Sequence, residues 1–323
     1  MKIFNAETFG IRIKNKAFKG KVHSVFASAC NIKTREDKII TLLVNSKPNQ
    51  PNGIRIVTPK EFVFSDWIKP GDSVSCQQEC LQIEEPNILV DMRLAHVWQN
   101  SLPRYLDDVD HAHILGQYKA ATKLFLMLTK QNIDSLKKSN SKIKRMDFLP
   151  ILYSKVENLT QSVRIDDQSK IRSEISSFIG FGPGLTPWGD DFLCGFMAGF
   201  DCLSKDLDQK IKLHKLRDIL IRNFDATGDI SKSMLSDAVL GQHGKLIVDT
   251  CQALFDPKFS PKLTSRICQL IEIGETSGSA SCLGILSGIA AVTKCNELYK
   301  VNFLRMMLRL KDKVYVPHLE TVP

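Results

Sequence analysis

The stretch Gly180-Phe-Gly-Pro-Gly-Leu-Thr-Pro-Trp-Gly-Asp-Asp-Phe-Leu-Cys-Gly195-Phe-Met-Ala-Gly199 joins a glycine-rich loop to the start of an apolar helix. A second stretch, Gly278-Ser-Ala-Ser-Cys-Leu-Gly284-Ile-Leu-Ser-Gly288, repeats the spacing G-x5-G-x3-G that begins at Gly189 in the first. Each repeat follows a loop that contains a threonine, Thr186 or Thr276. The sequence therefore predicts two similar units, each made of a loop and a helix.

The repeated glycines predict close packing between the two helices. Glycine in a helix interior costs about 1 kcal/mol relative to alanine, so its recurrence requires a compensating gain. Close approach of two backbones supplies that gain. We expect the helices at residues 189–203 and 278–293 to pack against each other, with both loops at one end. The alternative is that the glycines recur by coincidence in two separate buried helices.

The first loop is a candidate binding site for an anion. Gly182 and Gly184 permit backbone angles that are closed to other residues, and the neighbouring prolines stiffen the turn. The helix start that follows presents N–H groups and a partial positive charge, which attract phosphate or carboxylate. We predict that Gly182, Gly184, Leu185 and Gly189 bind substrate, and that the hydroxyl of Thr186 contributes to catalysis.

Asp190 and Asp191 lie in the first turn of the same helix. Carboxylates at this position stabilise a helix through its dipole, and this capping role is the simpler interpretation. Two adjacent aspartates beside a stiffened loop are also suited to bind a cation or to hold a substrate amide or ammonium group. We favour the second interpretation and predict both as catalytic residues, without a resident metal or other cofactor.

The second loop, Gly274-Glu-Thr-Ser-Gly278, offers two hydroxyls and a carboxylate at the equivalent helix start. By itself it is equally typical of an ordinary N-cap at Thr276 or Ser277. Because it pairs with the first loop, we predict that Thr276, Ser277 and Gly278 form a second, substrate-binding wall of one pocket.

The pattern of apolar and turn-forming residues changes near Trp98. Before it, short runs of β-forming residues are separated by turn signals. After it, apolar residues recur at helical spacing, as at residues 114–128 and 301–310. The predicted fold class is α+β: an antiparallel β-barrel or sandwich domain over residues 1–100, followed by a mainly α-helical domain over residues 101–323 that carries both loop–helix units.

The nine cysteines show no C-x-x-C pair, which is typical of free thiols in a reducing compartment. Cys76 and Cys80 come closest to a ligand pair, on a strand expected at residues 73–80, but no second pair with zinc spacing answers them. The N-terminus has no signal-peptide pattern, and the apolar stretches are shorter than the roughly 20 residues of a membrane span. We expect a cytoplasmic protein that does not bind membranes.

The formal net charge of +9 suits an anionic ligand or partner. The one basic cluster, residues 137–145, lacks interleaved aromatic residues, so we expect no nucleic-acid binding. The acidic and histidine residues at 107–113 are an alternative metal site. However, residues two apart do not share a helix face, and an acidic helix start explains them as well.

The residues Gly180 to Asp191, with Leu193 and Gly195, resemble the signature of the bacterial family that contains AllH, a subunit of oxamate carbamoyltransferase. Residues 20–26 and Thr276-Ser-Gly278 extend the resemblance over most of the chain. It implies a carbamoyltransferase complex of allantoin and purine catabolism, in which oxalurate and phosphate give oxamate and carbamoyl phosphate. It further implies an FdrA-like partner subunit and a small anionic metabolite, such as carbamoyl phosphate or oxamate, as ligand.

Two positions depart from the family pattern. A small residue usually stands in place of Trp188, and an aspartate usually stands in place of Ala280, which aligns with Asp191 in the internal repeat. Two functional classes therefore stay open. One is a catalytic carbamoyl- or acyl-transferase subunit, and the other is a noncatalytic scaffold or regulatory subunit that binds a metabolite, which the two departures favour.

Overall fold

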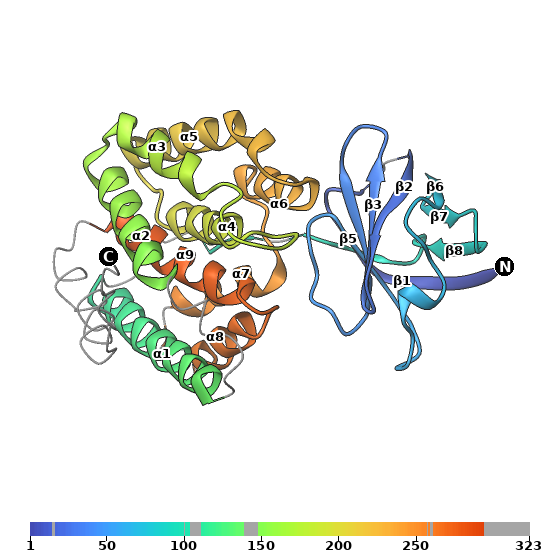
Figure 1. The fold of residues 1–323 in the computed structure, drawn as a ribbon, viewed down its shortest axis with the longest axis horizontal. Helices are drawn as coiled ribbons and strands as arrows, with labels where there is room; N and C mark the ends of the chain where they lie inside the picture. Colours follow the sequence, from blue (N-terminus) through green and yellow to red (C-terminus); the bar gives the residue numbers. More distant parts are fainter. Residues whose placement is uncertain are drawn as a thin grey trace, which may run out of the picture.

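The computed structural model describes residues 1–14, 17–99, 101–103, 111–138, 148–256, 258 and 261–293 (Figure 1). Within these residues the strands come first and the α-helices follow. The strands are β1 (Lys2–Gly10), β2 (Phe18–Val25), β3 (Ala29–Thr34), β4 (Ile39–Val44), β5 (Gly53–Ile56), β6 (Ser73–Gln77), β7 (Cys80–Ile83), β8 (Ile88–Asp91) and β9 (His96–Trp98). The α-helices are α1 (His111–Lys138), α2 (Phe148–Ile165), α3 (Gln168–Phe178), α4 (Trp188–Cys202), α5 (Leu207–Arg222), α6 (Asp229–Val239), α7 (Lys245–Leu254), α8 (Leu263–Ile271) and α9 (Ser277–Val292).

The strands form a closed β-barrel. Their order is β5-β4-β3-β2-β6-β7-β8-β1-β9, and a further pairing of β5 with β1 closes the ring. The expected α+β fold, a barrel followed by a mainly helical region, is confirmed. The sheet is mixed rather than wholly antiparallel, because β4–β5, β1–β8 and β1–β9 are parallel pairings. A parallel pairing cannot be closed by a tight hairpin, and residues 45–52 form the longer connection between β4 and β5.

A single strand was expected at residues 73–80, but the structure has a hairpin of β6 and β7 there. Gln77 pairs with Cys80, and the two turn residues between them, Gln78 and Glu79, have φ angles of 48° and 59°. Glycine or asparagine usually occupies such positions, so no turn signal is visible in the sequence. Cys76 and Cys80 therefore lie on neighbouring strands, and burial raises the pKa of the Cys76 thiol to about 11.

Helices α4 and α9 lie side by side in the middle of the helical region and are buried along most of their length (Figure 1). Their glycines face carbonyl oxygens of the other helix, and a Cβ atom at any of these positions would lie between 2.0 and 2.2 Å from that oxygen. The pairs are Gly195 with Ser281, Gly199 with Ile285, Gly284 with Phe192 and Gly288 with Phe196. The predicted close packing is therefore confirmed, and the order of the pairs shows that the two helices run parallel.

The internal repeat extends to the helices that precede α4 and α9. A Cβ at Gly189 would lie 1.9 Å from the carbonyl oxygen of Phe178 in α3, and one at Gly278 would lie 1.8 Å from that of Leu270 in α8. Each unit is thus a helix, a loop and a second helix that begins against the end of the first. The first glycine of each unit serves this packing.

Some expected features lie outside the described residues: the acidic positions 107–110, most of the basic cluster at 137–145, and the helix at 301–310. The division into two domains at residue 100 stays a prediction. In the part of the chain that the structure describes, no helix is long and apolar enough to cross a bilayer, and no group of three or more metal-binding side chains occurs.

Candidate functional site

The two predicted loops meet at their helix starts. The hydroxyl oxygens of Thr186 and Ser277 lie 3.1 Å apart and share a hydrogen bond. This contact follows from the parallel packing of α4 and α9, which brings both N-termini to one end of the pair. The loops that precede α4 and α9 are therefore in contact at the starts of the two helices.

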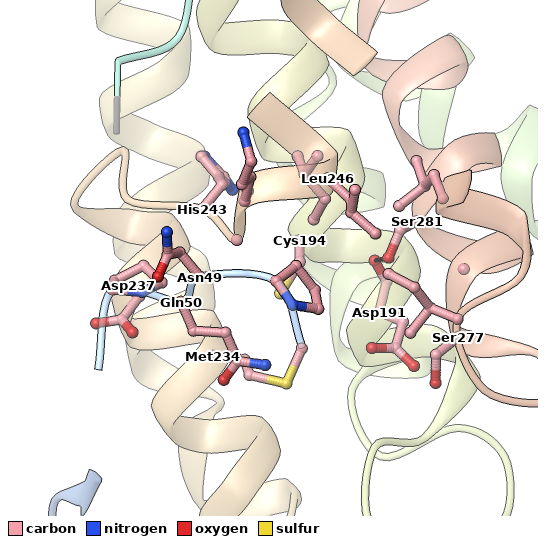
Figure 2. Close-up of a pocket in the computed structure, with 18 of the residues that line it drawn as sticks. Asn49, Gln50, Asp191, Cys194, Met234, Asp237, His243, Leu246, Ser277 and Ser281 are labelled. Carbon is pink, nitrogen blue, oxygen red and sulfur yellow. Dashed lines mark hydrogen bonds between the residues drawn. The ribbon is translucent and has the colours of Figure 1, made fainter. Parts of the chain in front are cut away.

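A pocket of about 140 Å³ lies next to this contact (Figure 2). A cavity of about 150 Å³ holds benzene, so the pocket suits a ligand of roughly six to eight non-hydrogen atoms. Its walls come from α4, α6, the segment between α6 and α7, the start of α7, α8, α9, and the connection between β4 and β5. The polar lining residues are Asn49, Gln50, Asn52, Asp191, Asp237, Gln242, His243, Lys245, Ser277 and Ser281.

Asp191 is the buried carboxyl group of this pocket. The residue is 2% exposed, and its Oδ2 atom is buried without a hydrogen-bond partner. Burial raises the pKa of Asp191 to about 7; the charge of Asp190 adds to the rise, while the hydroxyls of Ser277 and Thr186 offset part of it. A carboxyl group in this state is able to accept a hydrogen bond when ionised and to donate one when protonated.

Asp190 points elsewhere, although it is adjacent to Asp191. Its Oδ1 accepts a hydrogen bond from the backbone N–H of Gly180 at 2.9 Å, and its Oδ2 accepts one from the hydroxyl of Thr227 at 2.5 Å. Asp190 does not line the pocket. Neighbouring residues on a helix face different directions, which gives the two aspartates separate surroundings. Asp190 fastens the loop between α3 and α4.

The backbone amides at the start of α4 donate hydrogen bonds within the first loop. The backbone N–H groups of Gly189, Asp190 and Asp191 donate to carbonyl oxygens of the loop itself, at Phe181 and Pro187, over 2.9 to 3.2 Å. These three amides are therefore used within the loop that opens α4, and the anion site expected at this helix start stays a prediction.

Gly182, Gly184 and Leu185 lie on the exposed side of the first loop and do not line the pocket. The two glycines have φ angles of 111° and 100°, so the shape of the loop requires them, and their role in substrate binding stays a prediction. Thr276 is exposed as well. Of the predicted set, Asp191, Ser277 and Gly278 line the pocket, and Thr186 stands one contact behind Ser277.

The start of α7 forms a pocket wall that the sequence analysis did not predict. The backbone N–H of Lys245 donates to the carbonyl of Asn49 at 2.9 Å, which joins the helical region to the connection between β4 and β5. Leu246 and Ile247 also line the pocket, and their amides lie in the first helical turn, where no helix carbonyl precedes them. The available signal was Gly244 immediately before an apolar helix.

Two titratable side chains, His243 and Asp237, complete the surroundings of this wall. His243 is buried, and burial together with the nearby charge of Arg217 lowers the pKa of its imidazole to about 3. It is therefore neutral at physiological pH. Asp237 forms an ion pair with Arg12 of the β-barrel at 3.0 Å, which balances its charge.

The second copy of the repeat has no matching carboxyl group. In the alignment of the two units, Trp188 corresponds to Ser277 and Ala280 corresponds to Asp191. Trp188 stacks on Phe192 with ring centroids 5.4 Å apart, and Ala280 is fully buried. The repeat therefore has one polar pair and one apolar pair at equivalent places.

Two family models match the chain. The model described as oxamate carbamoyltransferase subunit AllH matches residues 178–289, and the model of the AllH family N-terminal domain matches residues 4–97. The chain belongs to the AllH family. The pocket takes its walls from both matched segments. No solved structure matches the chain.

Proposed function

We propose that this protein is a subunit of a cytoplasmic carbamoyltransferase similar to oxamate carbamoyltransferase, and that it acts in purine catabolism. Its pocket beside Asp191 binds a small anionic metabolite such as carbamoyl phosphate or oxamate. The observation that carries the proposal is the Oδ2 atom of Asp191, which is buried in the pocket wall without a hydrogen-bond partner. Buried polar atoms are almost always paired, so a missing ligand is a natural partner.

The pocket has the polar groups that such a ligand needs. Carbamoyl phosphate and oxamate each carry an amide group and an anionic group. The carboxyl of Asp191 and the hydroxyl of Ser277 suit the amide, and the first-turn amides of α7 suit the anion without a metal or other cofactor. Transfer of a carbamoyl group also requires the second substrate and the catalytic groups of partner subunits, of which one is FdrA-like.

A noncatalytic, metabolite-binding subunit is the second candidate. The apolar pair Trp188 and Ala280, at the place equivalent to Ser277 and Asp191, favours it because only one of the two units retains a carboxyl group. In this case the chain binds the metabolite and regulates or supports a complex whose chemistry lies in the partner.

The test begins with thermal unfolding of the full chain in the presence of carbamoyl phosphate, oxamate or inorganic phosphate. A ligand at 100 times its dissociation constant stabilises a protein by about 2.7 kcal/mol, which is easily detected. We expect carbamoyl phosphate or oxamate to stabilise the chain more than phosphate does. No stabilisation by either would contradict the proposal.

Turnover then separates the two candidates. The chain is combined with its FdrA-like partner, and carbamoyl phosphate formation from oxalurate is measured for the parent chain and for Asp191→Asn. A loss of turnover of at least about 100-fold, with the complex intact, supports a catalytic subunit, since catalytic groups contribute on this scale. Unchanged turnover with altered metabolite binding supports the noncatalytic alternative.

A further inference from the structure

We infer that Asp191, aided by Ser277, distinguishes an amide from a carboxylate of the same shape at one end of the pocket, while the start of α7 binds the anionic end of the ligand. The inference rests on the proposed function and assigns the residue that determines specificity at its site. It concerns binding and requires no covalent step.

The placement of the residues gives the pocket two different ends. Figure 2 shows Asp191 and Ser277 together on one side, and His243, Asn49 and Asp237 on the other. The pocket volume of about 140 Å³ leaves room for one small ligand between them. A compact molecule with two unlike ends is therefore held in a single orientation.

The Asp191 end favours a group that donates hydrogen bonds. Its Oδ2 has no hydrogen-bond partner within the protein, and the residue is almost completely buried in the pocket wall. An amide NH₂ placed here donates to the carboxylate. A ligand carboxylate at the same place brings two negative charges together in a poorly solvated environment, which is strongly unfavourable.

The start of α7, which also lines the pocket, favours an anion. The amides of Leu246 and Ile247 lie in the first turn of α7, where the partial positive charge of the helix adds to their hydrogen-bonding capacity. Two carboxylates near this end are already balanced: Asp237 pairs with Arg12 at 3.0 Å, and Asp249 of α7 pairs with Lys245 at 3.1 Å and with Arg266 at 3.2 Å. The anionic group of the ligand is thus directed away from Asp191 and toward α7.

Oxamate and oxalate test the inference because they differ only in an NH₂ group and an oxygen. Their affinities for the full chain are measured by calorimetry at about pH 8, where Asp191 is mostly ionised. We expect oxamate to bind at least about tenfold more tightly, which corresponds to about 1.4 kcal/mol. In Asp191→Asn, whose amide accepts and donates, we expect the ratio to fall to within about threefold of one.

Asp208→Asn is the matched control. It removes the same charge from an exposed side chain on α5 that pairs with Lys212, and it should keep the parent ratio. If Asp191→Asn does not unfold cooperatively, Asp191→Ala replaces it and should abolish the preference in the same way.

The outcomes separate this inference from the proposed function. Equal binding of oxamate and oxalate by the parent chain overturns the inference and leaves the proposed function standing. A preference that survives in folded Asp191→Asn overturns the assignment to Asp191. Failure of oxamate, oxalate and carbamoyl phosphate to bind at all removes both the inference and the proposed function.

Discussion

Thr186 and Ser277 are 91 positions apart in the chain, yet their hydroxyl oxygens lie 3.1 Å from each other at the paired starts of α4 and α9. Both hydroxyls lower the pKa of Asp191, against the larger effect of its burial. The contact therefore links the loop of one repeat to the ionisation of a carboxyl group in the pocket. The pKa of Asp191 thus depends on a hydroxyl from each of the two loops.

Removal of the Ser277 hydroxyl should therefore change the titration of Asp191. In Ser277→Ala the carboxylate loses a group that stabilises its ionised form, so the pKa of Asp191 should rise above its parent value of about 7. Carbon-13 NMR of labelled aspartate measures this directly. Thr276→Ala, at the exposed neighbouring position, is the control and should leave the titration unchanged. A fall in the pKa would contradict the contact.

The raised pKa of Asp191 also predicts how stability depends on pH. The folded chain binds this proton up to about pH 7, whereas an unfolded aspartate loses it near 3.8, so stability should decrease as pH rises between these values. A shift of about three pH units corresponds to at most roughly 4 kcal/mol. Asp191→Asn lacks this contribution and should become more stable than the parent chain above pH 7.

Urea unfolding at several pH values provides the measurement. The difference between the parent chain and Asp191→Asn isolates this carboxyl group from the neighbouring Asp190 and from the other titratable groups of the pocket lining, Asp237, His243 and Lys245. Two curves that stay parallel from pH 4 to 8 would show that Asp191 is not buried as the structure describes.

Asp190 should behave differently from its neighbour. Its two oxygens accept hydrogen bonds from Gly180 and Thr227, and asparagine supplies only one acceptor oxygen. Asp190→Asn should therefore lose about 1 to 3 kcal/mol of stability. The fraction of this variant that folds should keep the preference of the parent chain for oxamate over oxalate. Chemical unfolding and calorimetry measure the two effects. A loss of ligand selectivity with normal stability would show that the roles of the two aspartates are exchanged.

The packing of α4 against α9 should not tolerate a methyl group. In Gly195→Ala the new Cβ would lie 2.0 Å from the carbonyl oxygen of Ser281, so the helices must move apart, at a cost of about 1 to 3 kcal/mol. Gly116→Ala in α1 is the matched control. No atom lies within 4 Å of its new Cβ, and the better helix propensity of alanine should stabilise it by up to about 1 kcal/mol. Thermal unfolding of both variants gives the comparison, and equal effects would contradict the packing.

Local patterns in the sequence predicted the features that depend on neighbouring residues. The glycine spacing was sufficient to predict that α4 packs against α9, because each glycine lies at a helical position where the backbone of the other helix comes close. Strand β1 has no comparable local signal, because only some of its residues are buried and its partners β5, β8 and β9 are distant in sequence. Its pairings close the barrel.

The candidate site was predicted in part for the same reason. Asp191 and Ser277 follow from the repeat, but periodicity does not show which of two adjacent aspartates faces a pocket. The wall formed by Asn49 and the start of α7 depends on a contact between segments almost 200 residues apart, at Lys245. No local pattern encodes such a contact. The glycines of the loop before α4 permit the turns in which its amides donate to its own carbonyl oxygens, but their presence does not predict those hydrogen bonds.

The hydrogen bond from the backbone amide of Lys245 to the carbonyl of Asn49 has a consequence for how the two matched segments evolve. It places one wall of the pocket in the segment matched by the N-terminal family model and the other walls in the segment matched by the AllH model. A recombination event that exchanged either segment for a distant relative's would break a shared surface rather than swap an independent module. The two segments are therefore expected to co-evolve, because a substitution around residues 48–52 changes the surface that packs against the start of α7.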